Sequence, residues 1–415
     1  MRTRLLIGTI VTILSAAQPA SAQSKHWTLR QCTEYAVSHN IQIKQRDNQR
    51  IQREIQLSTA KNSRLPDLSG SVSERFSFGR GLTVDNTYTN RSTSSTSFSI
   101  GTNVPLFTGF KIPNNIKLNQ LNLEAATQDL EKAKNDIRMQ VARLERFLEN
   151  GKASGADVSQ QKATLAQSQL TATQAQNNLH LALLVLTQLL ELPTPEGFSI
   201  VRPNLNNQNI LNIPSDPNII YQEALLFKPE VKAEQLRLDA SEKNIKIAQA
   251  ALYPTLSLTG GLQSNYNTIS GVPSDGFFSQ LKNNFSQYIG LSLNVPIFNR
   301  FSTRNSIRSA RIDRENQQLQ LDNIKKTLYK EIQQVYYNAV AAQAKYESSE
   351  VARQSSEDAF TLTQAKYENG KANITEFNEA KNRYLKAESD LVQARYEYLY
   401  QTSLLDFYRG KELNF

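Results

Sequence analysis

The chain of 415 residues is only 39% hydrophobic and 8% aromatic, which is too lean for one large compact core. One cysteine, two methionines and three histidines argue against disulfide frameworks, thiolate zinc sites and histidine metal clusters. The formal net charge is +9, but acidic and basic residues are interspersed along the chain. We therefore expect a solvated surface and no nucleic-acid partner.

The N-terminal segment, 1–22, has the pattern of a secretory signal peptide. Arg2 and Arg4 precede an apolar run, and Ala20-Ser21-Ala22 offers small residues for cleavage before Gln23. The apolar run is too short for a permanent membrane helix, which is the alternative. The single cysteine, Cys32, is expected on a helix face and not as a nucleophile.

Three segments of the chain occur twice, in the same order. The pairs are Leu65-Pro-Asp-Leu68 with Tyr253-Pro-Thr-Leu256, Phe98 to Phe107 with Ile289 to Phe298, and Glu149-Asn-Gly-Lys-Ala153 with Glu368-Asn-Gly-Lys-Ala372. These matches predict two tandem repeats, each with a helix and two strands followed by a helical hairpin. The first repeat is placed at 23–200 and the second at 218–415, with a Pro- and Asn-rich surface connector at 201–217.

Alternating apolar and polar residues predict four strands, two in each repeat. They are expected at about 66–79, 96–107, 254–266 and 286–298. One face is apolar, and the other is rich in Ser, Gly and Asn, with few charges. Long polar loops are expected between the paired strands, at 79–96 and 265–282. A half-buried sheet over a soluble core is the alternative, but the predicted helices offer little apolar surface to cover such a sheet.

The helices carry narrow apolar seams with the three- and four-residue steps of a coiled coil. One seam runs through Leu321, Ile324, Leu328, Ile332, Val335, Ala339, Ala342 and Tyr346, and its partner runs from Phe377 to Tyr398. Residues 303–369 contain neither Pro nor Gly, so a rod of roughly 100 Å is allowed. Gly370 is expected to end this helix and Asn373 to cap the next, while Gly151 and Ser154 are their counterparts in the first repeat. The hairpins are predicted at about 112–192 and 303–408.

This arrangement resembles the TolC family of outer-membrane channel proteins over nearly the whole mature chain. The most specific residues are Asn103-Val-Pro-Leu-Phe-Thr-Gly-Phe110 and Asn294-Val-Pro-Ile-Phe-Asn-Arg-Phe301, together with the two hairpin tips. The resemblance implies a mainly α protein with a small β part, in which three copies give four antiparallel strands each to a 12-stranded barrel in outer-membrane lipid. It also implies a passive conduit of an efflux or secretion system, with a periplasmic adaptor and an inner-membrane transporter as partners.

The resemblance further assigns roles at the hairpin tips. Gly151, Ser154, Gly370 and Asn373 match positions that meet the adaptor. Glu376 and Glu379 match acidic positions around the closed mouth of the tunnel, and Asp157 stands at the corresponding place in the first repeat. A ring of such carboxylates would favour cations. The alternative is two solvated glutamates at a helix start, where negative charge is favourable.

One departure from the family pattern concerns length. The offset between matching segments grows from 191 at the strands to 219 at the tips, so the first descending helix is shortened near Val141 to Arg143. The shortening amounts to about 28 residues, or four whole heptads, which keeps the seam in phase. At ~1.5 Å per residue the loss is roughly 42 Å. We expect the first tip to end far from the second and the duct to be impaired, unless the first ascending helix slides or bends.

Two other classes of function remain open. A coiled-coil surface or adhesive protein built on the same rods and strands is the second hypothesis, and an enzyme is the third. The sequence lacks the HExxH, GxSxG and GxxxxGK[ST] motifs, and it has no GxGxxG motif that opens a helix after a strand, so no catalytic residue and no cofactor is predicted.

Overall fold

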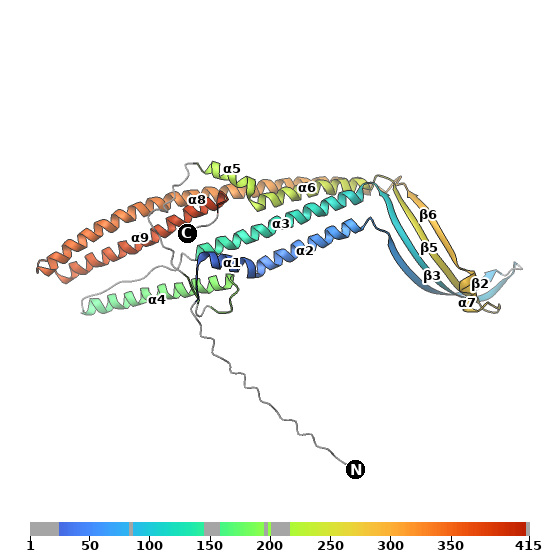
Figure 1. Ribbon diagram of the computed structural model, residues 1–415, viewed down its shortest axis with the longest axis horizontal. Helices are drawn as coiled ribbons and strands as arrows, with labels where there is room; N and C mark the ends of the chain where they lie inside the picture. The colour runs from blue at the N-terminus through green and yellow to red at the C-terminus, as the bar shows by residue number, and fades with distance from the viewer. Residues whose placement is uncertain (1–24, 83–85, 145–157, 195–197, 201–215, 412–415) are drawn as a thin grey trace, which may run out of the picture.

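The computed structural model describes residues 25–82, 86–144, 158–194, 198–200 and 216–411, and it forms an elongated molecule with a curved sheet at one end (Figure 1). The helices are α1 Leu29–His39, α2 Ile41–Asn62, α3 Lys111–Leu144, α4 Val158–Leu189, α5 Pro217–Phe227, α6 Pro229–Ala250, α7 Phe277–Asn283, α8 Ser302–Glu368 and α9 Ile374–Tyr408. The strands are β1 Lys25–Trp27, β2 Asp67–Leu82, β3 Tyr88–Thr108, β4 Phe198–Ile200, β5 Thr255–Ile269 and β6 Ser286–Asn294.

The four long strands form one antiparallel sheet in the order β2-β3-β5-β6, so β2 and β6 are its edges. The register places Val72 opposite Phe98, Ile100 opposite Leu262 and Leu258 opposite Leu291. Because alternate residues point to opposite faces of a sheet, the apolar residues of all four strands lie on one face. The predicted two-faced, open, four-stranded sheet is thus confirmed by the register.

The strands differ in length from the prediction. The first hairpin extends beyond its expected ends, to Leu82 and back from Tyr88, so most of the expected loop at 79–96 is strand. The Ser- and Thr-rich sequence of β3 alternates only weakly between apolar and polar residues, but it pairs residue for residue with β2. The last strand ends earlier than expected, at Asn294. Val295, Ile297 and Phe298 after it are largely exposed, and Ile297 reaches 95%.

The second expected loop, at 265–282, contains a short helix that was not predicted. Strand β5 runs on to Ile269, and α7 then packs against its distal end. The ring of Phe277 in α7 lies 5.1 Å from Tyr266 and 6.1 Å from Phe98, centre to centre. The Phe277 side chain of α7 therefore lies on the apolar face of the sheet.

Helix α8 is continuous over 67 residues and packs along α9, as the uninterrupted sequence predicts (Figure 1). Leu321, Leu328, Ile332, Val335, Ala339 and Ala342 of the predicted seam are buried. In the partner seam, Ala394 and Tyr398 are buried, whereas the residues nearer the hairpin tip are half-buried. The seam residues therefore pack between the two helices as predicted, and they are most buried in the half of the hairpin nearer the middle of the molecule.

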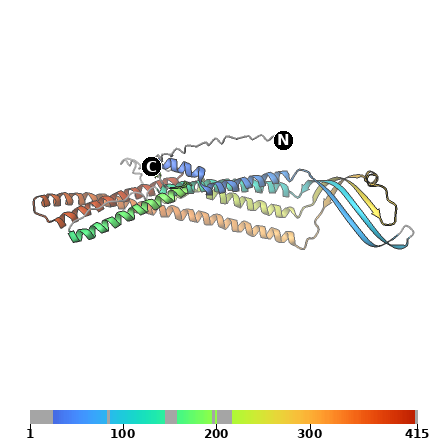
Figure 2. The same ribbon diagram turned by 90° about the horizontal axis from the view of Figure 1, so that it is seen from below.

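The first hairpin is asymmetric. Helix α3 is described over 34 residues, about half the length of α8, whereas α4 has 32 residues and α9 has 35. Both views show α4 extending beyond the end of α3 in the direction of the α8–α9 tip (Figures 1 and 2). Residues 145–157, which include the first tip, lie outside the described residues. The expected four-heptad shortening thus stays a prediction, but the short helix is α3, and α4 still reaches toward the depth of the second tip.

The well-packed part of the molecule lies midway along its length, in two clusters. One joins α5, α6, α8 and the end of α9 through residues such as Ile220, Leu238, Ile332 and Leu405. The other joins α1, α3 and α4 through Cys32, Ile137, Leu186 and Leu190, so Cys32 is a buried core residue. A parallel pair of three-residue strands, β1 and β4, closes the second cluster. These strands were not predicted, because their partners are far apart in the sequence.

The two strand-to-helix junctions have the same backbone geometry. Gly109 and Phe110 have φ of 60° and 65°, and Arg300 and Phe301 have φ of 55° and 61°. Each pair of left-handed residues precedes a long helix, α3 or α8. Phe107 with Phe110 and Phe298 with Phe301 form edge-to-face pairs, each with ring centres 5.4 Å apart. Three such left-handed residues are not glycine, a conformation that costs about 1–2 kcal/mol per residue.

Candidate functional site

The polar face of the sheet is built from small hydroxyl and glycine residues. Ser71 and Ser99 lie opposite each other on β2 and β3, and their hydroxyl oxygens are 2.7 Å apart. Tyr288 of β6 lies over Gly261, where any Cβ would come within 2.8 Å of its ring and of the Ile100 carbonyl oxygen. Glycine at this position therefore lets the tyrosine ring lie flat on the sheet. Such a face is suited to water and not to a packed core.

The apolar face is exposed in this single chain. Its most exposed residues are Leu68, Val72, Phe76, Phe78, Ile289, Leu291 and Leu293. The edges β2 and β6 also carry unpaired backbone donors and acceptors. An exposed apolar face of this extent is typical of a surface that lies against lipid or another protein chain.

The tip between α8 and α9 has the helix-ending geometry that the sequence predicts. Gly370 has φ of +69°, and the Lys371 N–H donates to the Lys366 carbonyl at 2.8 Å. The Asn373 side chain then accepts from the Glu376 N–H at 2.9 Å and so caps α9. Phe377 packs beside Tyr367 across the tip, with ring centres 5.0 Å apart. Both local roles are confirmed and need no partner protein.

The candidate constriction residues are only partly brought together. Glu376 and Glu379 are both exposed on the first two turns of α9. The Glu376 carboxylate accepts from the Asn373 side-chain amide at 3.2 Å, so part of its role is helix capping. Gly151, Ser154 and Asp157 lie outside the described residues. Their relation to the second tip therefore stays a prediction.

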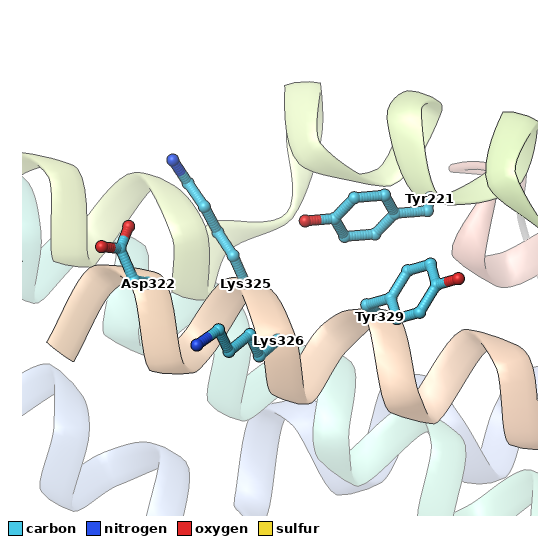
Figure 3. Close-up of a pocket in the computed structure, with 5 residues that line it drawn as sticks. All are labelled: Tyr221, Asp322, Lys325, Lys326 and Tyr329. Carbon is cyan, nitrogen blue, oxygen red and sulfur yellow. The ribbon is translucent and has the colours of Figure 1, made fainter. Parts of the chain in front are cut away.

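A hollow of about 360 Å³ lies between α5 and α8 (Figure 3). Tyr221 and Tyr329 form its aromatic side, with ring centres 5.2 Å apart and near-perpendicular planes. Asp322, Lys325 and Lys326 line the rest, and the two ammonium groups point in different directions (Figure 3). Enzyme pockets bring polar groups to one point, so this hollow does not have the layout of a catalytic site.

A buried lysine connects the helices in the middle of the molecule. Lys228, between α5 and α6, is only 4% exposed, and its ammonium nitrogen lies 4.2 Å from the ring centre of Phe407 and 4.3 Å from that of Tyr408. Burial lowers the pKa of Lys228, although the carboxylates of Glu230 and Glu331 oppose this shift. This residue was not predicted, since a Lys-Pro pair between helices is no sign of burial.

Charged contacts also tie the long helices together. Arg237 of α6 forms an ion pair with Asp129 of α3 and another with Glu234 on its own helix. Gln317 of α8 donates to the other oxygen of Glu234 at 2.6 Å. Helices α3, α6 and α8 are thus linked through one partly buried network, which fixes their relative rotation.

The described ranges contain no candidate metal site. Within them, no group of three or more His, Cys, Asp or Glu side chains is placed to hold a metal ion. Among the helices of the same ranges, none combines the length and apolarity that crossing a bilayer requires.

Comparison with known proteins identifies relatives of one kind. Residues 220–410 match the family model described as outer membrane efflux protein. The chain is 26% identical over 267 residues to the probable efflux pump outer membrane protein TtgC of Pseudomonas putida, covering 63% of this chain and 51% of TtgC. It is 25% identical over 182 residues to the outer membrane protein TolC of Vibrio cholerae, covering 43% of this chain and 41% of TolC. The chain thus spans about half or less of the length of these curated relatives.

The fold agrees with these matches. The Campylobacter jejuni CmeC outer membrane channel superposes with a TM-score of 0.75 and 18% sequence identity, covering 93% of this chain and 87% of CmeC. At this identity the likeness concerns the fold. The hypothesis of a surface adhesin finds no support among these relatives and structures. Residues 220–410 are thus similar to outer membrane efflux proteins, and the chain shares the fold of a solved outer membrane channel.

Proposed function

We propose that this protein is the outer-membrane channel component of a tripartite efflux or secretion system. Three copies would each give four strands to one 12-stranded barrel in the outer membrane, and their helices would form the wall of a passive conduit across the periplasm. Energy would come from an inner-membrane transporter, coupled through a periplasmic adaptor. The protein would carry out no reaction of its own.

The observation that supports this proposal most directly is the register of the sheet. It places the Leu, Ile, Val and Phe side chains of the four strands on one side, interrupted by Glu74 with Ser94 and Thr96, and Ser, Gly and Asn on the other. In hydrocarbon, the unpaired edges of β2 and β6 would each leave several backbone groups without partners. Closure with neighbouring copies removes both edges, which makes assembly a condition of insertion into the membrane.

The tandem-repeat organisation belongs to the same proposal. The matching left-handed residues at 109–110 and 300–301 support a duplicated unit of two strands and a hairpin. The unequal lengths of α3 and α8 support a shortening within the first unit. We propose that the shorter α3 weakens the wall of the conduit, since the distal part of α4 has no α3 beside it.

For the hairpin tips, we propose that Gly370 and Asn373, with Gly151 and Ser154, lie where the adaptor docks. Glu376 and Glu379, with Asp157, would ring the periplasmic mouth of the pore. Glu379→Gln tests the ring without removing the Asn373–Glu376 cap. It should reduce cation selectivity in planar bilayers, whereas Glu350→Gln on the exposed side of α8 should not. Unchanged selectivity for Glu379→Gln would show that this glutamate does not lie at the pore mouth.

The decisive experiment compares the two faces of one strand. Ser97 and Ile100 of β3 lie on the polar and apolar faces respectively. Each is replaced by cysteine in a Cys32→Ala background, and single-channel conductance is recorded before and after a charged, water-soluble thiol reagent is added. We expect block for Ser97→Cys and no change for Ile100→Cys. Absence of conductance, or of heat-sensitive trimers on gels, would contradict the proposed channel.

A further inference from the structure

The two edge strands of the sheet differ in length. β2 has 16 residues and β6 has 9. Both are attached to long helices at the same end of the sheet, β2 after α2 and β6 before α8. If the β6 edge of one copy pairs with the β2 edge of the next, the loop end of β2 has no strand partner across this seam.

Helix α7 occupies the position that a longer β6 would take. The last β5–β6 pair is Gln263 with Ser286, and β5 continues to Ile269 without β6 beside it. Along this stretch the Gln280 side chain accepts from the Asn267 N–H at 2.9 Å and donates to the Asn267 carbonyl at 3.0 Å. The Asn284 side chain donates to the Asn265 carbonyl at 2.7 Å. The helix thus replaces a strand beside β5 and lies next to the seam.

The exposed aromatic residues of α7 and of the loop end of β2 lie on the same face of the sheet. Phe277 packs on Phe98 and Tyr266 of the apolar face, and the Phe278 ring, 5.3 Å from Phe277, is 83% exposed. On the loop end of β2, Phe76 and Phe78 are 64% and 78% exposed. They share the face of Phe98, because Val72 lies opposite Phe98 and alternate residues follow it.

We infer that α7 docks on a second copy of this chain, with Phe278 packed against Phe76 and Phe78 at the loop end of the next copy's β2. The inference rests on the proposed trimeric barrel and adds a specific contact to it. Aromatic rings are well suited to such a contact, since they bury a large area and pair edge to face. The helix covers the part of the β2 edge that the shorter β6 cannot reach, and so protects it from pairing with other strands.

Cross-linking in outer membranes tests this contact. In a Cys32→Ala background, Phe278→Cys is combined with Phe78→Cys, and a short bismaleimide reagent is added. We expect linked dimers and trimers on denaturing gels. The matched control combines Phe278→Cys with Ser77→Cys, the neighbouring residue on the opposite face of β2, and this pair should give no linked species.

A second cysteine pair separates this inference from the proposed function. Ser292→Cys in β6 and Ser71→Cys in β2 both lie on the polar face, near the helix-attached ends of their strands, and should be linked across the seam of the proposed barrel. Linkage of the seam pair without the Phe278 pair would overturn the α7 contact and leave the barrel standing. Loss of linkage in both pairs would overturn the barrel and the contact together.

A double-substitution comparison tests packing without cysteines. Phe278→Ala should lower the temperature at which trimers dissociate. Adding Phe78→Ala to this variant should lower the temperature less than Phe78→Ala does alone, because the two rings contact each other. Fully additive losses would show that the two rings do not contact each other and would overturn the inference.

Discussion

The side-chain amide of Gln280 makes both hydrogen bonds that a neighbouring strand would make with Asn267. One glutamine in a seven-residue helix therefore closes the backbone edge of β5 beyond the end of β6. An exposed strand edge invites pairing with other chains, so a side chain in this position serves stability and assembly together.

Gln280→Ala should loosen this edge. Each hydrogen bond of this kind contributes about 0.5–1.5 kcal/mol, so amide exchange at the end of β5 should speed up by up to about tenfold. Hydrogen–deuterium exchange with mass spectrometry of the peptide covering 265–269 measures the effect. Gln287→Ala, at an exposed glutamine of β6, is the control. Equal exchange in the two variants would mean that the Gln280 contacts do not hold the edge.

A positive charge should be costly on one face of β6 and tolerated on the other. Leu291 lies on the apolar face and Ser292 on the polar face of the same strand. A lysine facing the middle of a bilayer costs about 2–4 kcal/mol, whereas one facing a water-filled lumen costs little. We therefore expect Leu291→Lys to reduce the trimer fraction in outer membranes, measured by heat-sensitive gel migration, and Ser292→Lys to leave it unchanged. The reverse order would exchange the lipid and lumen faces.

Gly109 is a position where a side chain would clash as well as strain the backbone. Its φ is +60°, and a Cβ there would lie 2.5 Å from the Ala250 carbonyl oxygen and 2.8 Å from the Tyr253 Cβ. Gly370 has a similar φ of +69° but open space around it. Gly370→Ala should cost only the conformational strain of roughly 1–2 kcal/mol. Gly109→Ala should cost clearly more, as measured by thermal unfolding in detergent, and equal losses would argue against the close approach of α6.

Lys228 makes stability depend on pH in a defined direction. Burial lowers its pKa in the folded state, so between that value and the ordinary pKa of about 10.4 the unfolded chain binds more protons than the folded one. The contribution of Lys228 to stability should therefore rise with pH across this window. Lys228→Met keeps contact with Phe407 and Tyr408 without the charge, and should unfold at a higher temperature than the unmodified protein at neutral pH.

This advantage of Lys228→Met should shrink as the pH rises toward the ordinary lysine pKa. Circular dichroism melts at several pH values measure the difference. Lys232→Met, at an exposed lysine one turn further along α6, controls for the loss of one positive charge. A constant difference at every pH would show that Lys228 stays protonated throughout and that its aromatic contacts offset its burial.

Restoring four heptads after Val141 tests the importance of the short α3. An insertion of this length matches the difference between the segment offsets, keeps the seam in phase and should give α4 a partner along its length. We expect higher bilayer conductance and more heat-resistant trimers than for the unmodified chain. A shorter insertion that breaks the heptad phase is the control. Equal conductance of the restored and unmodified proteins would show that the short arm does not impair the duct.

The sequence alone determined the local features of this protein. Alternation in the strands set the apolar and polar faces, and the absence of Pro and Gly between 303 and 369 allowed the continuous rod. The helix end at Gly370 and the N-cap at Asn373 could also be predicted from the sequence, because each depends on residues close together in the chain. For the same reason, steps of three and four placed most seam residues correctly.

The tertiary structure decided what depends on residues far apart in the chain. The parallel pairing of β1 with β4, the burial of Lys228 under two rings of α9, and the replacement of a strand by α7 have no local pattern. Periodicity records which face of an element avoids water, and it says nothing about which distant element covers that face. The pairing of distant elements is set only in the folded chain, where apolar faces are covered and backbone and side-chain polar groups form hydrogen bonds.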